Sequence, residues 1–387
     1  MSAQDIQEQT QTAASTSTPT STSDTLTEER AEQRDAFVGR IFASALGGFE
    51  VLSIYLGDRL GLYRALVEHG PATAKELASH THTSERYIRE WLEQQAAAGI
   101  LVTDNATAPA LDRRYQLPTA HAEVLVSETS LNYMTPLSSA LYGLASQLPA
   151  VADAFQHGGG VPWADYGDIA RAGQAALNRP VFDQLLGQIW LPSIPDIHKR
   201  LRTDPPARIA DIACGYGWSS VAMARAYPTV RIDGFDSDEP SIIAAREIAE
   251  RHGLADRLTF ATRDIADPAL TGRYDLVTVF EALHDMSRPV EALRNIRRLI
   301  ADGGAVLIMD ENVGESFTAP ANEVDRFMYC VSVFLCLPTG MAEQPSAGTG
   351  TVMRPDTVRR YASEAGFRDV EILPIEHPFF RFYRLYA

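Results

Sequence analysis

The C-terminal half of this 387-residue chain alternates short apolar runs with longer amphipathic segments, and this alternation constrains the fold most. The expected strands are residues 208–213, 231–236, 257–261, 274–281 and 305–310, and the expected helices between them are 218–227, 239–252 and 289–300. Such alternation is typical of a mostly parallel sheet with helices on both faces. After a last helix near 356–365, a short turn joins the runs 370–375 and 379–386, which should therefore be antiparallel. We predict an α/β fold with a seven-stranded mixed sheet.

Residues 35–118 show a different, mainly helical pattern. The segment 36–56 is apolar on most of its faces, so a helix there favours burial against another surface, such as a second copy of the chain. Further on, Ser84 is placed to cap a helix that Gly99 ends, and two short runs flank a turn at 104–113. Helix, turn, helix and a two-stranded wing are typical of a winged-helix domain. We predict such a domain here, and we expect it to form a homodimer.

The charges argue against nucleic acid or a membrane as the main partner. The formal net charge is −16, whereas proteins that bind phosphate groups usually present a basic surface. On the helix that would read DNA, Arg86 and Arg89 are offset by Glu85, Glu90 and Glu93. No uninterrupted apolar stretch is expected to be long enough to cross a bilayer. These features favour a scaffold role for the winged helix.

The remaining segments predict a cytoplasmic protein with a helical region before the sheet. Residues 1–34 are rich in Ser, Thr and Gln and lack the features of a signal peptide, so a disordered tail is expected. The three cysteines form no CxxC pair, which favours reduced thiols. Residues 119–204 are expected to be a helical connecting region that contributes to a substrate pocket, and residues 205–387 form the sheet domain.

A glycine-containing turn follows the first expected strand. Asp211 ends that strand, and Ala213, Cys214, Gly215 and Gly217 form the turn before the next helix. Glycines at such a place let the backbone turn tightly and approach a ligand closely. The helix that follows offers free amide groups. A turn of this kind is a weak signal by itself, because many nucleotide-binding proteins have one.

Polar side chains at the ends of the next strands strengthen this signal. Asp236 and Ser237 end the second strand, where an acidic residue can accept both ribose hydroxyls of a nucleoside. Asp264 ends the third and can bind an adenine amino group, with Ile265 against the ring. The fourth strand ends in Phe280 and Glu281. Open α/β sheets bind ligands at the carboxyl ends of their strands. The pattern therefore predicts a nucleoside site there.

This series of motifs resembles the class I S-adenosylmethionine-dependent methyltransferases, whose Rossmann-like sheet carries an acidic-x-Gly-x-Gly-x-Gly turn. Ala213 stands here in the place of the first glycine. The resemblance covers about half of the chain, from Arg208 onward, and implies S-adenosyl-L-methionine as the cofactor. It implies that Asp211 faces the methionine amino group, Asp236 the ribose and Asp264 the adenine. The cofactor residues that we expect are Asp211, Ala213, Cys214, Gly215, Gly217, Asp236, Ser237, Asp264, Ile265, Phe280 and Glu281.

The whole layout is similar to small-molecule O-methyltransferases with an N-terminal winged-helix domain, and this implies methyl transfer to a hydroxyl oxygen. In those enzymes a His-Asp pair after the fourth strand carries the base, and His284 and Asp285 match that place. Met286 stands where the family has a tryptophan, and the glutamate that orients the histidine has Glu311 and Glu343 as candidates. A histidine of near-neutral pKa suits removal of a hydroxyl proton. The alternative is that His284 only shapes the site.

Two further segments are expected to contact the acceptor. The long connection 312–350 contains an apolar, aromatic helix that would cover the substrate. The alternative for these side chains is ordinary core packing. The candidate acceptor contacts are Tyr142, Trp190, Phe327, Met328 and Phe334.

Two other functions compete with that of an enzyme acting on a small molecule. One is a winged-helix transcriptional regulator that senses S-adenosylmethionine, against which the acidic helix 84–93 counts. The other is a nicotinamide-dependent oxidoreductase, against which the position of Asp264 and the antiparallel end of the sheet count. No acidic or histidine cluster in the sequence calls for a metal ion, so none is expected.

Overall fold

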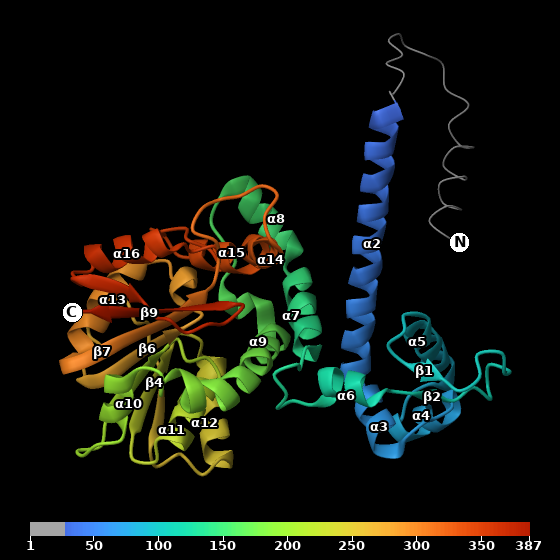
Figure 1. The fold of residues 1–387 in the computed structure, drawn as a ribbon, viewed down its shortest axis with the longest axis horizontal. Helices are drawn as coiled ribbons and strands as arrows, with labels where there is room; N and C mark the ends of the chain where they lie inside the picture. Colours follow the sequence, from blue (N-terminus) through green and yellow to red (C-terminus); the bar gives the residue numbers. More distant parts are fainter. Residues whose placement is uncertain (1–27) are drawn as a thin grey trace, which may run out of the picture. The chain divides into compact units, whose positions relative to one another are not determined.

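The computed structural model of the protein describes residues 28–387 (Figure 1). The chain divides into two compact units, with the boundary between Pro118 and Thr119. The first helix, α2 (Glu28–Arg59), begins inside the predicted tail 1–34. The expectation of disorder is therefore wrong for residues 28–34, because their run of Glu, Arg, Ala and Gln favours a helix. For residues 1–27 that expectation lies outside the described part of the chain.

The N-terminal unit has the predicted winged-helix elements. Its helices after α2 are α3 (Leu62–His69), α4 (Ala74–Thr81) and α5 (Glu85–Ala97), and its wing pairs β1 (Val102–Thr103) with β2 (Tyr115–Gln116) in antiparallel fashion. Thr73 begins α4 with a capping box, in which Thr73 and Glu76 each accept the backbone N–H of the other. Leu62, Leu77 and Leu92 are fully buried and hold the three short helices together.

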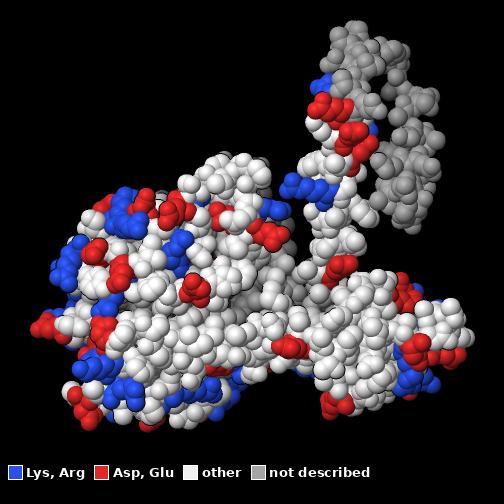
Figure 2. All heavy atoms as spheres, in the orientation of Figure 1, with Lys and Arg blue, Asp and Glu red and all other residues white. Residues whose placement is uncertain are grey.

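Helix α2 is long and apolar, and its apolar side chains are exposed in the described structure. Phe49 is 73% exposed, and Phe37, Ile41 and Leu56 are each more than half exposed. Figure 2 shows uncharged stretches along this helix between a few charged groups. By length and composition, α2 and the helical stretch Glu323–Met341 could each span a membrane. Charged residues such as Arg40 and Glu50 interrupt α2, so the expectation that no uninterrupted apolar stretch is long enough to cross a bilayer stays a prediction.

The C-terminal unit begins with a layer of helices. They are α6 (Thr119–Val126), α7 (Thr135–Ser146), α8 (Leu148–His157), the 3-10 turn η1 (Trp163–Tyr166), α9 (Gly167–Val181), the π-helix η2 (Phe182–Trp190) and α10 (Pro195–Leu201). Helices α7 and α9 pack closely, because Gly173 of α9 lies against the backbone of α7 at Pro136 and Ala140. The layer runs into the sheet through Asp204 and Pro205.

The sheet has seven strands in the order β5-β4-β3-β6-β7-β9-β8. The strands are β3 (Arg208–Ile212), β4 (Arg231–Asp236), β5 (Leu258–Thr262), β6 (Tyr274–Phe280), β7 (Ile300–Glu311), β8 (Asp369–Ile372) and β9 (Phe380–Tyr386). Strands β3 to β7 pair in parallel, and β9 pairs antiparallel with both β7 and β8. The predicted Rossmann-like mixed sheet, with its antiparallel end, is confirmed.

Helices cover both faces of the sheet (Figure 1). On one face lie α11 (Trp218–Ala226), α12 (Glu239–Arg251), η2 and α10, and on the other α13 (Pro289–Leu299) and α16 (Pro355–Glu364). Strand residues are buried on both faces, as Ile209 and Ala210 are, which explains why the strands are continuous apolar runs in the sequence. This packing fixes the carboxyl ends of the parallel strands as a rigid edge.

The connection between β7 and α16 contains a helical part that lies against the helical layer. It consists of α14 (Glu323–Val331), the π-helix η4 (Ser332–Cys336) and α15 (Leu337–Met341), which form the helix expected there. The Tyr166 hydroxyl donates to the carbonyl of Phe334 at 2.7 Å, and the Val161 N–H donates to the carbonyl of Pro338 at 2.9 Å. Gly160 permits this approach, because a Cβ there would lie 2.0 Å from the Pro338 oxygen.

Candidate active site

A cavity of about 570 Å³ lies at the carboxyl ends of the parallel strands. Its walls come from the ends of β3, β4, β5 and β6, from α9 in the helical layer and from the segment around η4. Most of the predicted cofactor residues, and both predicted catalytic residues, line this cavity. The predicted residues among its lining are Asp211, Ala213, Cys214, Gly215, Asp236, Ser237, Asp264, Ile265, Phe280, Glu281, His284 and Asp285.

The turn after β3 has backbone angles that favour glycine and allow the chain to turn tightly. Gly215 has a φ of 52° and Gly217 a φ of 75°, and a Cβ on Gly217 would lie 2.8 Å from the Phe260 ring. Ala213, at the place of the missing first glycine, also has a positive φ, of 54°. That conformation is unfavourable for alanine, so the turn is held by its surroundings. The Gly217 N–H donates to the Cys214 carbonyl at 2.8 Å, which closes the turn.

Asp211 is fully buried beneath this turn. Its carboxylate accepts hydrogen bonds from the hydroxyls of Ser219 at 2.6 Å, Ser220 at 2.7 Å and Thr278 at 2.7 Å. Burial raises the pKa of Asp211, and the three hydroxyl donors oppose that rise. The side chain thereby ties the start of α11 to β3 and β6 below the cavity.

Asp236 ends β4 and holds the glycine turn from the other side. One of its oxygens accepts the Gly215 N–H at 2.8 Å and the other accepts the Asp238 N–H at 2.9 Å. Burial raises the pKa of Asp236, and these backbone donors lower it. Each carboxylate oxygen keeps a further lone pair for a donor in the cavity. Beside it, burial raises the pKa of the Cys214 thiol well above its usual value, so Cys214 is no thiolate nucleophile.

Asp264 and Ile265 follow β5 at the same edge. Asp264 accepts the Ala266 N–H at 2.7 Å and pairs with Arg288 at 2.7 Å, and its side chain is 47% exposed. Ile265 is buried and offers an apolar wall. In this arrangement Asp264 is accessible to a polar group of a ligand, and Ile265 can contact a ring of that ligand.

Two glutamates, the partly buried Glu281 and the buried Glu311, also line the cavity. Glu281 follows β6 with a φ of 51°, and Asn178 and Gln174 of α9 donate to its carboxylate. Burial raises the pKa of Glu281 to about 7. Burial and the neighbouring charge of Glu281 raise the pKa of Glu311 well above its usual value, and Glu311 Oε2 has no hydrogen-bond partner among the described residues. Strained backbone and raised pKa values of this kind concentrate at functional sites.

His284 lies in the short 3-10 turn η3 (Leu283–Asp285) and is 2% exposed. Its Nδ1 lies 2.9 Å from Asp310 Oδ1, and its Nε2 lies 3.3 Å from Asp285 Oδ1. Burial lowers the pKa of His284, but the charges of Asp310 and Asp285 outweigh it, so the pKa lies well above its usual value. The residue that orients the ring is therefore Asp310, at the end of β7, rather than Glu311 or Glu343. An aspartate at the end of the strand next to β6 is the sequence signal for it.

Cys336 of η4 completes this end of the cavity. Its thiol, the His284 ring and the Asp285 carboxylate have polar atoms within 4.8 Å of one another. Burial raises the pKa of the Cys336 thiol to about 12, so it stays protonated and acts as a hydrogen-bond donor. The cluster thus joins the segment around η4 to the loop that carries His284.

The structure does not bring the five candidate acceptor contacts to this cavity. Trp190 is buried with its ring centroid 4.7 Å from that of Phe382, and Met328 is buried too. Tyr142, Phe327 and Phe334 are each more than a third exposed. The apolar wall is formed instead by neighbours along the same segments, Phe182, Val331 and Leu335.

Two family models match parts of this chain. Residues 204–345 match the family model described as a methyltransferase domain, and residues 48–127 match one described as an Rv2258c-like winged HTH domain. The chain therefore contains a methyltransferase domain and, before it, a winged helix-turn-helix domain.

Named methyltransferases are among the relatives and the solved structures of similar fold. The chain is 24% identical over 303 residues to the mitomycin biosynthesis 6-O-methyltransferase of Streptomyces lavendulae, covering 73% of this chain and 80% of that protein. Its fold resembles mitomycin 7-O-methyltransferase MmcR, with a TM-score of 0.63, 19% identity and coverage of 92% and 100%. It also resembles human N-acetylserotonin methyltransferase in complex with S-adenosylmethionine, with a TM-score of 0.64, 17% identity and coverage of 94% and 99%. The chain spans less than half the length of three other curated relatives.

Proposed function

We propose that this chain transfers a methyl group from S-adenosylmethionine to a hydroxyl oxygen of a small molecule. The observation that carries the proposal is convergence: the glycine turn, Asp236, Asp264 and His284 all line one cavity. The residues present fit the cofactor, because Asp236 has lone pairs for ribose hydroxyls and Gly215 of the turn lines the cavity without a side chain. When bound, the cofactor supplies an activated methyl group on a sulfonium that leaves as a neutral thioether.

The chain's own residues position the acceptor and remove its proton. In the neutral ring, the Nδ1–H of His284 donates to Asp310, and the lone pair on Nε2, which lies 3.3 Å from Asp285 Oδ1, accepts the hydroxyl proton. The carboxylate of Asp310 then stabilises the protonated ring. The helical layer and the segment around η4 form walls of the cavity, which bring the acceptor and the cofactor together.

This mechanism predicts a pH dependence. The base must be neutral, and the pKa of His284 lies well above its usual value, so the turnover number should rise with pH through that raised pKa and fall below it. Asp310→Asn removes a charge that raises the pKa, and it should move the rising limb to lower pH. The check is a pH–rate profile at saturating cofactor between about pH 6 and pH 9. A profile that stays flat over that range would rule out proton removal by His284.

Isothermal calorimetry tests the cofactor assignment directly. The purified protein should bind S-adenosylhomocysteine with one site per chain and release heat that NADH does not produce. A methyl-transfer assay against a panel of phenols, alcohols and amines then identifies the acceptor atom. Failure of the protein to bind either S-adenosylhomocysteine or S-adenosylmethionine would overturn the proposed function.

We further propose that α2 pairs with a second copy of the chain. Arg40 and Glu50 interrupt its apolar surface, and each charge in the middle of a bilayer would cost about 3 kcal/mol. At an interface between copies, such charges can stay at the solvated rim. On the N-terminal unit itself, Arg86 pairs with Glu90 at 2.6 Å and Arg89 with Glu85 at 3.4 Å. These pairs offset the positive charges of α5 and count against binding of this helix to DNA.

Changing the exposed apolar face of α2 should dissociate the protein. Phe37→Glu with Phe49→Glu places two charges on this face, and we expect the mass measured by light scattering to fall from that of a dimer to that of a monomer. Tyr87→Glu, at an exposed aromatic residue of α5, serves as the control and should leave the mass unchanged. A wild-type monomer, or flotation of the protein with lipid vesicles, would contradict the pairing.

A further inference from the structure

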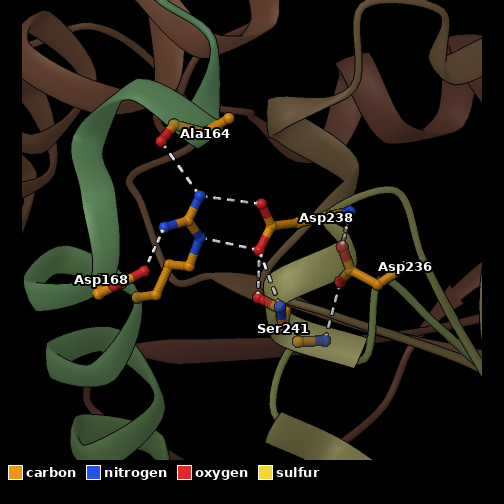
Figure 3. Close-up of polar contacts among 7 residues, drawn as sticks. Ala164, Asp168, Asp236, Asp238 and Ser241 are labelled. Carbon is orange, nitrogen blue, oxygen red and sulfur yellow. Dashed lines mark hydrogen bonds and ion pairs between the residues drawn. The ribbon is translucent and has the colours of Figure 1, made fainter. Parts of the chain in front are cut away.

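We propose that Arg171 is a positioning residue for the cofactor: it holds, from the helical layer, the loop that carries the ribose-binding carboxylate Asp236. The inference rests on the proposed cofactor site. Arg171 contacts Asp168, Ala164 and Asp238, which Figure 3 shows around one guanidinium group with Asp236 beyond. Nothing in the motif around Asp236 identifies Arg171, because Arg171 comes from a helix far earlier in the sequence.

Arg171 lies on α9 with a side chain that is only 5% exposed. Its Nε donates to Asp238 Oδ2 at 2.8 Å, and its Nη2 donates to Asp238 Oδ1 at 3.1 Å, so the guanidinium meets the carboxylate with two parallel bonds. The other donors reach Asp168 Oδ1 at 3.0 Å and the Ala164 carbonyl at 3.1 Å. A two-pronged pair of this kind fixes orientation as well as charge.

Asp238 connects this ion pair to the strand-end loop. Its side chain is 5% exposed and begins α12 by accepting the Ser241 N–H at 3.0 Å and the Ser241 hydroxyl at 2.6 Å. Its own backbone N–H donates to Asp236 Oδ1 at 2.9 Å. The position of Asp238 therefore fixes the position of its backbone N–H, which is one of the two donors that orient the Asp236 carboxylate.

The second donor to Asp236 is the Gly215 N–H of the glycine turn, at 2.8 Å. A continuous series of hydrogen bonds thus runs from α9, through Arg171, Asp238 and Asp236, to the turn. Arg171 and Asp238 themselves line the cavity, as do Trp163 and Ala164, the segment that Arg171 anchors. Arg171 therefore fixes two walls of the proposed nucleoside site at once.

The competing explanation is that the Arg171–Asp238 ion pair only stabilises the fold. Measurements of stability and of cofactor affinity distinguish this explanation from a positioning role. Removing one partner of a buried pair leaves an uncompensated charge and destabilises the fold, whatever its function. Removing both partners relieves that charge and is often neutral for stability. A positioning role predicts that the double variant regains stability but not cofactor affinity, because no group then holds the loop in place.

Three variants test this with calorimetry on S-adenosylhomocysteine and with thermal unfolding. Arg171→Met should raise the Kd about tenfold to a hundredfold, the range expected when a binding group is misplaced by about 1 Å. Arg171→Lys keeps the charge but loses the two-pronged contact and should fall between the wild type and Arg171→Met. Arg171→Met with Asp238→Asn should unfold near the wild-type temperature yet keep a weakened Kd. An asparagine side chain can still cap α12, so this double variant should fold even if Arg171→Met does not.

Arg200→Met is the matched control. Arg200 pairs with Asp275 at 2.8 Å in the same unit and does not line the cavity, so its loss should lower the unfolding temperature without changing the Kd. The inference is overturned if the double variant recovers wild-type affinity, or if Arg171→Lys binds as tightly as the wild type. A wild-type protein that binds no S-adenosylhomocysteine would instead overturn the proposed function.

Discussion

His284→Gln should lower the turnover number by about 10²-fold to 10⁴-fold, the contribution typical of a positioned general base, while leaving the Kd for S-adenosylhomocysteine within about twofold of wild type. Glutamine can still donate to Asp310 Oδ1 and fill a similar space, but it cannot accept and hold a proton at neutral pH. The substitution therefore removes proton transfer and keeps most of the shape. Turnover is measured as formation of S-adenosylhomocysteine with saturating cofactor and acceptor.

His377→Gln provides the control for this prediction. His377 stacks on Phe380 with centroids 4.7 Å apart, in the same unit, and it does not line the cavity. The same chemical change there should leave turnover near the wild-type value. If His284→Gln retained wild-type turnover, His284 would only shape the site, and the proton would have to leave by way of solvent or another group.

The order and nature of the sheet elements could be predicted because both faces of the sheet are covered. Strands buried on two faces are mostly apolar, as β3 is at Ile209, Ala210 and Ile212, and such runs stand out between amphipathic helices. Element ends were less accurate: β7 begins at Ile300 rather than at the predicted residue 305. The start of α2 was missed because its first turns are charged and lack apolar periodicity.

The strand-end residues could be predicted for a topological reason, and their partners could not. Asp236, Asp264 and His284 each follow a parallel strand, so the sheet itself brings them to one edge. Asp310 shares that edge, but the choice of Asp310 over Glu311 depends on the pleat of β7. Arg171 comes from a helix far earlier in the chain, and only the packing of α9 on the sheet shows that it meets Asp238.

A change of helix type explains why the predicted acceptor contact Phe334 was misplaced. Residues 332–336 form a π-helix, whose wider turn rotates the side chains relative to an α-helix. As a result Leu335 and Cys336 line the cavity, whereas Phe334, which the sequence pattern favoured, is 37% exposed. Aromatic character indicates burial or contact somewhere, but it cannot tell which surface a helix presents.

Asp236→Ala should weaken binding of S-adenosylhomocysteine about 10²-fold to 10⁴-fold. Each hydrogen bond from a ribose hydroxyl to a charged carboxylate contributes about 1.5–3 kcal/mol, and the proposed site makes two of them. The substitution also frees the Gly215 N–H and the Asp238 N–H, which now orient this carboxylate, so the glycine turn loses a support. Calorimetry gives the Kd, and circular dichroism shows whether the variant is folded.

Asp233→Ala is the control that distinguishes a direct effect on cofactor binding from a general loss of stability. Asp233 lies on the same strand, accepts hydrogen bonds from Thr259 and Tyr274 and pairs with Arg208 at 2.7 Å, but it does not line the cavity. Its removal should lower stability and leave the Kd unchanged. If Asp236→Ala and Asp233→Ala weakened binding of S-adenosylhomocysteine equally, the effect would come from destabilisation of β4. The nucleoside would then have to bind elsewhere on the sheet. Unequal effects in the predicted order would place the ribose at the end of β4.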